Sequence, residues 1–288
     1  MKHLFLSLRP KQWIKNTFIF IPLIFGKRLL IFPANLKVFF AFCLFSLSAS
    51  AAYLINDILD IEKDKRHPIK SLRPIASGKV NIRLALTAAF ILLVFSITLS
   101  FILNIYFGYI IIVYSISNFF YSKILKKVVI IDVFSLAFFY LLRILSGGVV
   151  AEVKLSYWVI IMIALLAMFL GFNKRRQELD LFQEKAIRHR SILVEYDIYF
   201  IDQMIAVITS SITIVYMLYT VDIRTIREFG TTKLLLTMPF VYYGIFRYLY
   251  LIHKVKKDDD PIRILLSDIP LQLSIVLWII ACSAIIYF

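Results

Sequence analysis

Residues 56–80 read N-D-I-L-D-I-E-K-D-K-R-H-P-I-K-S-L-R-P-I-A-S-G-K-V and lie between two long apolar runs. The stretch holds four acids (Asp57, Asp60, Glu62 and Asp64) and five lysine or arginine residues before Ile75. Only 18% of the 288 residues are charged, against about 25% in a soluble domain. Such dense charge in so apolar a chain indicates a functional site. The simpler alternative is a solvated loop whose acids and bases pair with one another.

The acids follow a helical spacing. Asp60 lies three residues after Asp57, and Asp64 lies four residues after Asp60. Positions i, i+3 and i+7 share one face of a helix, so the three carboxylates are expected to form a stripe that repels itself unless a cation lies between them. Carboxylate oxygens, together with the amide oxygen of Asn56, suit Mg²⁺, which takes its remaining ligands from water and substrate phosphates.

Basic side chains follow the acids directly. They are Lys65, Arg66, His67, Lys70 and Arg73. Arginine binds phosphate oxygens, often through two parallel hydrogen bonds, and lysine binds them as a point charge. Acids for a metal ion and bases for phosphate groups in one stretch predict a Mg²⁺–diphosphate site.

The remaining composition predicts an integral membrane protein. Hydrophobic residues make up 61% of the chain, against about 45–50% in soluble domains. A membrane-spanning helix needs about 20 apolar residues. The fold class is expected to be all-α, because lipid cannot satisfy an open backbone and these runs lack the alternation of barrel strands. The nine expected spans are 17–32, 36–55, 82–103, 106–121, 130–150, 157–172, 200–219, 234–251 and 271–287.

The distribution of charge predicts the orientation of the chain. Lysine and arginine are concentrated in an amphipathic segment, residues 1–16, and in the loops after the second, fourth, sixth and eighth spans. The positive-inside rule therefore places the amino terminus and these loops in the cytoplasm and the carboxyl terminus outside, in a multi-pass protein of the inner (cytoplasmic) membrane. The formal net charge of +15 is attributed to this orientation and to anionic lipid headgroups, and no nucleic-acid partner is expected.

A second charged segment, residues 173–190, follows the sixth span and reads N-K-R-R-Q-E-L-D-L-F-Q-E-K-A-I-R-H-R. It is expected on the same side as the first, sharing with it a central cavity that opens to the cytoplasm. Here the bases Lys174, Arg175 and Arg176 precede the acids Glu178 and Asp180. From composition alone, a phosphate-binding loop and a positive-inside anchor are equally good interpretations.

The pattern N-D-x-x-D-x-x-x-D ending in R-H-P, between two spans, resembles the first aspartate-rich motif of the UbiA superfamily of intramembrane prenyltransferases. The resemblance implies one transmembrane domain over residues 1–288 with nine helices, catalytic loops near 56–80 and 173–196, and Mg²⁺ between them. Ordinary members carry D-x-x-x-D after helix 6, whereas this chain has K-R-R-Q-E-L at 174–179. That departure argues against a second acidic metal site and favours a basic pocket.

Further segments resemble one branch of the superfamily, which transfers 5-phosphoribose from phosphoribosyl diphosphate to decaprenyl phosphate. These segments are L-R-P-K-Q-W-I-K-N at 8–16, the whole of 56–78, and the second charged segment. The resemblance implies a Mg²⁺-dependent phosphoribosyltransferase whose partners are a polyprenyl phosphate, the phosphoribosyl donor and the bilayer. The metal ligands that it implies are Asp57 and Asp60, with Asn56 and Asp64 in support. The implied substrate-binding residues are Lys15, Arg66, His67, Lys70, Arg73, Lys174, Arg175, Glu178, Arg190 and Tyr196.

Four residues in the middle spans are further candidates. Asp132 begins the fifth span, either as a helix cap or as part of the site. Arg143 lies about three turns deeper, where a charge is costly and usually faces a cavity, and we include it with Asp57, Asp60 and Asp64 among the expected catalytic residues. Tyr121 and Lys123 resemble a Y-x-K feature found near such sites, although Lys123 also suits a membrane anchor.

Two other functions fit parts of the sequence. A prenyltransferase that moves a prenyl group from its diphosphate to an aromatic acceptor explains the first motif equally well, but it predicts acids at residues 174–176. A transporter or scaffold predicts charge or broken helices near the bilayer midplane. Apart from Arg143, charge here is concentrated at the cytoplasmic ends of the spans. The sequence is also compatible with a homo-oligomer.

Overall fold

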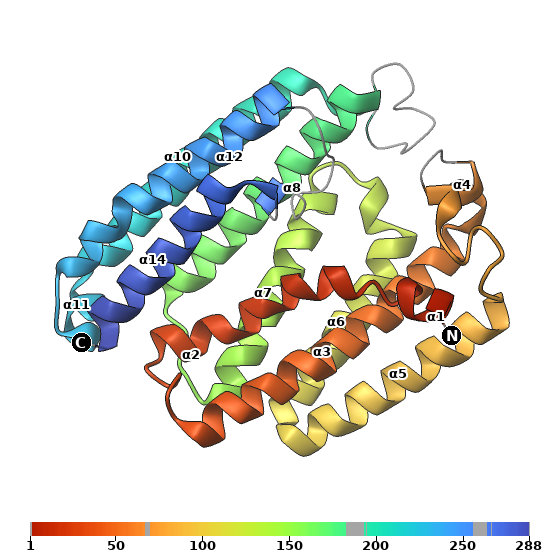
Figure 1. Ribbon diagram of the computed structural model, residues 1–288, viewed down its shortest axis with the longest axis horizontal. Coiled ribbons are helices and arrows are strands. Elements are labelled where there is room, and N and C mark those ends of the chain that lie inside the picture. Colours follow the sequence, from red (N-terminus) through yellow and green to blue (C-terminus); the bar gives the residue numbers. More distant parts are fainter. Residues whose placement is uncertain are drawn as a thin grey trace. The chain divides into compact units, whose positions relative to one another are not determined.

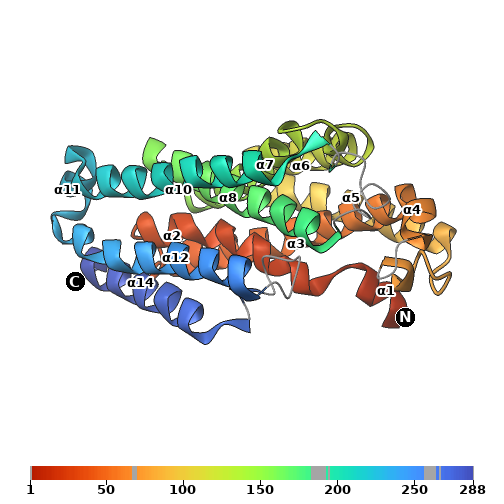
Figure 2. The same ribbon diagram turned by 90° about the horizontal axis from the view of Figure 1, so that it is seen from above.

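The protein is helical throughout the part of the chain that the structure describes. The computed structural model describes residues 2–66, 70–182, 193, 195–255, 264–265 and 267–287, and every regular element in these ranges is a helix (Figures 1 and 2). The chain divides into two compact units, Met1–Leu155 and Ser156–Phe288, and each is described by itself. That the two act as one domain stays a prediction.

The first unit is built around a single long helix, α3. Its elements are α1 (Lys2–Ser7), the 3₁₀ helix η1 (Pro10–Phe20), α2 (Ile21–Phe25), α3 (Phe32–Leu59), α4 (Ile61–Lys65), η2 (Lys70–Leu72), α5 (Ile82–Leu103), α6 (Ile105–Lys123), η3 (Leu125–Lys127) and α7 (Ile131–Ala151). The long helix packs against η1, α5, α6 and α7, and Figure 1 shows it in orange between η1 and α5. The long helix therefore has neighbours from most of the unit.

The 3₁₀ helix η1 approaches α7 closely because residue 147 is a glycine. A methyl group at Gly147 would lie only 2.0 Å from the backbone oxygen of Ile19, so a larger residue there would push the two elements apart. Ile19 is fully buried in the same apolar cluster as Phe45 of α3 and Phe139 of α7. This close packing fixes η1, and with it Asn16, against the middle of α7.

The second unit pairs α8 with α10 and α12 with α14. Its elements are α8 (Tyr157–Phe182), α10 (Ile198–Val221), α11 (Ile223–Phe229), the 3₁₀ helix η6 (Lys233–Thr237), α12 (Met238–Val255) and α14 (Ile269–Tyr287). An ion pair of 2.8 Å joins Arg247 of α12 to Asp268, the residue before α14. At another point, the indole nitrogen of Trp278 in α14 donates a hydrogen bond of 2.8 Å to the hydroxyl of Tyr216 in α10.

Eight helices in the described part of the chain are long and apolar enough to cross a membrane, against the nine expected. The difference is the first expected span, residues 17–32, which instead forms the end of η1, the short helix α2 and an irregular link to α3. Pro22 lies in the first turn of α2, and a proline removes a backbone donor and kinks or breaks a longer helix. Residues 17–32 therefore do not form one long helix, and the count of nine spans stays a prediction.

The second charged segment also differs from the expectation. The sixth span was expected to end near residue 172, with a loop from 173 onward, but α8 continues to Phe182. Lys174, Arg175 and Glu178 therefore lie on a helix. Hydropathy locates the end of the apolar run, and a helix can extend past that point because its hydrogen bonds are internal.

Candidate active site

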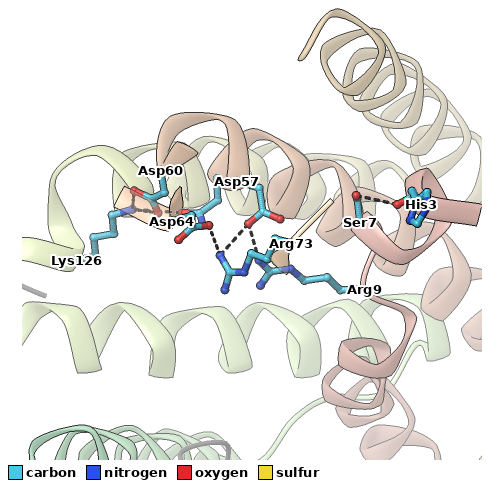
Figure 3. A network of polar contacts seen from close by, with 9 residues as sticks. His3, Ser7, Arg9, Asp57, Asp60, Asp64, Arg73 and Lys126 are labelled. Carbon is cyan, nitrogen blue, oxygen red and sulfur yellow. Dashed lines mark hydrogen bonds and ion pairs between the residues drawn. The ribbon is translucent and has the colours of Figure 1, made fainter. Parts of the chain in front are cut away.

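The predicted acids lie where α3 ends, but they do not occupy one continuous helix face. Asn56 and Asp57 are in the last turn of α3, which ends at Leu59. Asp60 separates it from α4, with φ −97° and ψ 6°, and Asp64 lies on α4. The expected stripe of three carboxylates is thus broken at Asp60. Figure 3 shows Asp57 and Asp64 facing a common point, while Asp60 contacts a different partner.

The common point is occupied by the side chain of Arg73. One guanidinium nitrogen of Arg73 lies 3.1 Å from Oδ1 of Asp57 and 2.6 Å from Oδ2 of Asp64 (Figure 3). Arg73 follows η2, and its backbone N–H donates to the carbonyl of Lys70 at 3.0 Å. The short turn therefore directs a basic side chain from residues 70–73 back onto the acids that precede it in the sequence.

Arg9 supplies a second cation to Asp57. Its guanidinium donates to Oδ1 of Asp57, and its Cζ lies 5.1 Å from the centre of the Tyr53 ring. The backbone of Arg9 is left-handed, with φ 53° and ψ 58°, a conformation that costs a residue other than glycine about 1–2 kcal/mol. Strain of this kind is commonly found where function requires a particular side-chain direction.

Lys126 also belongs to the acid–base cluster, although the sequence did not single it out. Its ammonium group lies 2.6 Å from Oδ2 of Asp60 and donates to Oδ1 of Asn56 at 3.3 Å. Lys126 belongs to η3, which packs against α6 and α7. The available signal was the Lys126-Lys127 pair in a loop expected on the same side of the membrane as the acids. Lys123, chosen instead, is exposed, with its ammonium group 5.8 Å from the centre of the Phe119 ring.

The acids and bases of the cluster are matched in number and differ in exposure. Arg9, Arg73 and Lys126 pair with Asp57, Asp64 and Asp60. The side chains of Asp57 and Asp64 are only 3% and 6% exposed, whereas those of Arg9 and Arg73 are 25% and 26% exposed. The pairing that the solvated-loop alternative predicted is present, but these acids are not solvated.

A solvated pair does exist one turn away, and it provides a contrast. Lys65 and Glu62 contact each other at 2.8 Å, with both side chains at least half exposed. The hydrogen bond from Lys65 lowers the pKa of the Glu62 carboxyl. Such surface pairs contribute little to stability, whereas charges taken out of water cost several kcal/mol each before pairing. A chain that buries two acids, partly buries a third and pairs all three with bases is consistent with a functional rather than a stabilising arrangement.

The cluster fits a metal ion that is shared with a substrate. No group of three or more His, Cys, Asp or Glu side chains among the described residues is placed to hold a metal ion alone. Mg²⁺, however, usually takes one or two carboxylates and completes its shell with water and phosphate oxygens. Asp57 and Asp64 already converge on a point that holds a positive nitrogen, so their geometry suits a cation between them.

Arg143 is buried away from the acids, in a cage of aromatic rings. It donates to Oδ1 of Asn16 at 2.8 Å and to the carbonyl of Phe139, and its guanidinium carbon lies 5.1 Å from the centre of the Phe45 ring. Phe45 precedes Asp57 by twelve residues on α3, which is about 18 Å along a helix axis. The structure therefore does not bring Arg143 together with the carboxylates, and its catalytic role stays a prediction.

The other predicted residues of the first unit differ in burial. Asp132 is fully buried in the first turn of α7, although the residue that caps this helix is Ile130. Tyr121 packs its ring edge-on against Phe139 at 5.6 Å. Lys15 and Lys70 are half-buried, and Arg66 is exposed. His67 lies outside the described residues.

The predicted residues of the second unit have partners within that unit. Arg175 is 1% exposed and pairs with Glu178 one turn later on α8. Arg176, adjacent to it, contacts Asp202 of α10 at 2.6 Å. Tyr196 is buried and stacks on Phe200, with ring centres 6.3 Å apart. Lys174 is half-buried. Arg190 lies outside the described residues.

Together, the eight apolar helices and the charged end of α3 define a multi-pass membrane protein with a buried acid–base site at the end of one span. The UbiA prenyltransferase family model matches residues 18–269, and the chain belongs to this family. It is similar to the decaprenyl-phosphate phosphoribosyltransferase of Mycobacterium tuberculosis, with 31% identity over 98% of this chain and 93% of that protein. The corresponding protein of Mycolicibacterium smegmatis is also 31% identical, over 98% of this chain and 92% of that protein.

The fold agrees with solved structures. A UbiA homologue from Archaeoglobus fulgidus bound to DMAPP and Mg²⁺ has a TM-score of 0.70 and 16% identity, covering 97% of both chains. The structure of a digeranylgeranylglyceryl phosphate synthase has a TM-score of 0.67 and 20% identity, covering 100% of this chain and 99% of that one. At these identities the likeness shows the fold alone, and it confirms the all-helical, UbiA-like architecture expected from the sequence.

Proposed function

We propose that the protein transfers 5-phosphoribose from phosphoribosyl diphosphate to a polyprenyl phosphate and releases diphosphate. The reaction belongs to the pentosyltransferases, a class of glycosyltransferases. The observation that carries the donor chemistry is the convergence of Asp57 and Asp64 on one cationic nitrogen of Arg73, a geometry suited to a metal-bound diphosphate. The choice of phosphoribose over a prenyl group rests on the names of relatives that match nearly the whole chain.

The reaction needs charge placement more than proton transfer. An oxygen of the lipid phosphate forms a bond to the anomeric carbon of the ribose, and the bond from that carbon to the diphosphate breaks. A phosphate monoester is already anionic near neutral pH, so the acceptor needs no strong base. In this proposal Arg9, Arg73 and Lys126 hold phosphate oxygens, and a fixed carboxylate stabilises positive charge that develops on the ribose ring.

Mg²⁺ suits this site as the cofactor, with Asp57 and Asp64 as ligands and with Asp60 and Asn56 at its edge. When bound, the ion supplies positive charge to the leaving diphosphate. With the ion present, Asp57 and Asp64 would hold the metal, and Arg73 and Lys126 would be released to hold phosphate oxygens. Lys15, Arg66, His67 and Lys70 of the first unit, and Lys174, Arg175, Glu178, Arg190 and Tyr196 of the second, remain candidates for the ribose 5-phosphate and the lipid phosphate.

The proposed setting is the cytoplasmic membrane. The distribution of Lys and Arg supports an amino terminus and an acid–base cluster on the cytoplasmic side and a carboxyl terminus outside. A water-soluble donor then reaches the cluster from the cytoplasm through the expected central cavity, while the lipid acceptor arrives from the bilayer. Assembly into a homo-oligomer stays a prediction.

The test is a transfer assay in detergent with labelled phosphoribosyl diphosphate, a polyprenyl phosphate and Mg²⁺. We expect a labelled lipid that disappears on adding a chelator and that falls at least about a hundredfold in Asp57→Asn. Glu62→Gln is the matched control, because Glu62 is an exposed acid of the same stretch, and it is expected to keep full activity.

An assay for prenyl transfer tests the alternative function, an ordinary prenyltransferase. Transfer of a prenyl group from a polyprenyl diphosphate to an aromatic acid, with no phosphoribosyl transfer, would overturn the proposal in favour of an ordinary prenyltransferase. Activity that is equally reduced in Asp57→Asn and Glu62→Gln would show instead that the acid–base cluster is not the reacting centre.

A further inference from the structure

A groove lies between α6 and α7, next to the acid–base cluster and wholly within the first unit. It has a volume of about 540 Å³, and its walls include Ser117, Phe120, Leu125, Phe134 and Phe138. Phe139 also lines it and is buried, with its ring packed against Tyr114 and Tyr121 at 5.6 Å each. Aromatic packing therefore holds this part of the wall in place.

The walls of the groove are apolar and accessible. Phe120, Phe134 and Phe138 are 49%, 53% and 40% exposed, and the only polar side chains that line the groove are two serines. One of them, Ser135, is buried and donates its hydroxyl to the backbone of Ile131. Exposed phenylalanines on a membrane protein need no explanation one by one. Here they line a concave surface, which a flat lipid-facing wall does not provide.

Two lysines flank a residue that lines the groove. Leu125, one of its lining residues, directly precedes Lys126, whose ammonium group contacts Asp60. Two residues before Leu125 is Lys123, which is exposed and stands over the ring of Phe119. An apolar groove with lysines next to one of its lining residues matches a molecule with an anionic head and a long hydrocarbon tail. Lys126 links this side of the groove to the cluster that is proposed to bind the donor.

We propose that this groove binds the isoprenoid chain of a polyprenyl phosphate next to its headgroup, with the phosphate beside Lys123. This inference rests on the proposed function and names where its acceptor lies. The phosphate carries a charge of about −1.5 to −2 at neutral pH, which Lys123 matches. The phosphate is then held near Lys126 and the carboxylates, at the side of the cluster that faces away from Arg9.

The first test fills the groove. Ser117→Trp places an indole in the groove, whereas Ile116→Trp places the same group at an exposed position of α6 that does not line it. We expect Ser117→Trp to raise KM for a long polyprenyl phosphate about tenfold with KM for phosphoribosyl diphosphate unchanged, and Ile116→Trp to change neither. Equal effects of the two substitutions would overturn the proposal.

The second test does not depend on transfer. A polyprenyl phosphate with a photoreactive group in its first isoprene units is irradiated with the protein in detergent, and the labelled peptides are identified. We expect labelling within residues 117–139 that excess polyprenyl phosphate removes and excess phosphatidylglycerol does not. Labelling that both lipids remove would show an ordinary lipid contact. Labelling elsewhere would show a different acceptor site. Either result would overturn the proposal that the groove binds the polyprenyl phosphate.

The two proposals can fail separately. Phosphoribosyl transfer without labelling at residues 117–139 would overturn the assignment of the groove as the acceptor site and leave the proposed function unchanged. Specific labelling there, with no phosphoribosyl transfer, would keep the groove as a polyprenyl-phosphate site and remove the proposed function. Crosslinks between two copies of the chain through Phe134 or Phe138 would identify the groove as a subunit interface and overturn its assignment to lipid.

Discussion

Lys126 lies 2.6 Å from Asp60, although 66 residues separate them in the sequence. The contact ties the loop between α6 and α7 to the end of α3, so the third acid of the cluster has a cation that comes from neither the amino-terminal segment nor residues 56–80. Asp60 therefore pairs with a residue of η3, whereas Asp57 and Asp64 share Arg73. The cluster thus has two halves that mutation can separate.

Lys126→Met tests the first half. Loss of the Lys126 ammonium group leaves Asp60 unpaired and removes a positive charge beside the proposed diphosphate site. We therefore expect kcat/KM for the phosphoribosyl donor to fall by about tenfold to a hundredfold. Lys63→Met is the control, because Lys63 is an exposed lysine on α4. Steady-state kinetics with both substrates measure the change. If the two variants are equally active, Lys126 has no role in donor binding.

Arg73→Ala tests the second half through stability. The substitution leaves two buried carboxylates facing each other, and breaking a buried ion pair costs about 3–5 kcal/mol. We expect a lower melting temperature than that of the wild type. We also expect millimolar Mg²⁺ to raise it more in the variant than in the wild type, because the metal then meets both acids without competition from the guanidinium.

Thermal unfolding in detergent, with Mg²⁺ and with a chelator, measures this effect. Arg66→Ala is the control, because Arg66 is exposed in the same stretch. A melting temperature of Arg73→Ala that does not respond to Mg²⁺ would contradict a metal position between Asp57 and Asp64.

Gly147→Ala tests the packing of η1 on α7. The added methyl group would lie 2.0 Å from the backbone oxygen of Ile19, so η1 must move and the contact between Asn16 and Arg143 is disturbed. We expect destabilisation of about 1–3 kcal/mol, measured as a lower melting temperature. Gly244→Ala is the matched control, since its methyl group would meet Ser274 at an ordinary 3.8 Å. It is expected to be neutral or slightly stabilising, because alanine favours helices. Equal melting temperatures for the two variants would contradict the close approach.

The pair of Asp268 and Arg247 predicts a pH effect in the second unit. The hydrogen bond from Arg247 holds the pKa of the Asp268 carboxyl below its ordinary value. A carboxyl with a lowered folded-state pKa adds stability above its unfolded pKa, about 3.9, and loses it as the pH falls through the folded value. We expect Asp268→Asn to lower the melting temperature at pH 6 and to make no difference at the lowest pH that the protein tolerates. A deficit that stays constant with pH would indicate lost packing rather than lost charge.

The sequence was sufficient to predict the helical class, the eight long apolar helices, and the stretch that supplies the acids of the cluster. These follow from local patterns: apolar runs of helical length, and acids and bases concentrated in one stretch. The break at Asp60 was not predicted, because i, i+3, i+7 spacing shows only that one helix is compatible with the pattern. The extension of α8 to Phe182 was missed for a similar reason, since hydropathy reports the environment of a segment rather than its hydrogen bonding.

The identity of the bases that meet each acid was beyond local patterns altogether. Arg73 was expected to bind donor phosphate, yet in the structure it bridges Asp57 and Asp64. Lys126 was not considered, because nothing in the Lys126-Lys127 pair indicates which distant acid it contacts. Such contacts depend on how α3, η3 and α7 pack, and this packing cannot be inferred from the local patterns of a single sequence.

The guanidinium between Asp57 and Asp64 has a consequence for the turnover cycle. In the proposed reaction, a ligand that carries both a metal ion and phosphate groups would displace Arg73 from Asp57 and Asp64 and offer it phosphate oxygens as new partners. On release of diphosphate and the ion, Arg73 would return to the two carboxylates, so that these buried charges would not be left unpaired. The arginine would thereby compete with the metal-bound product for the same acids. Replacing Arg73 is therefore expected to free Asp57 and Asp64 for the metal ion while removing one partner of the phosphate groups.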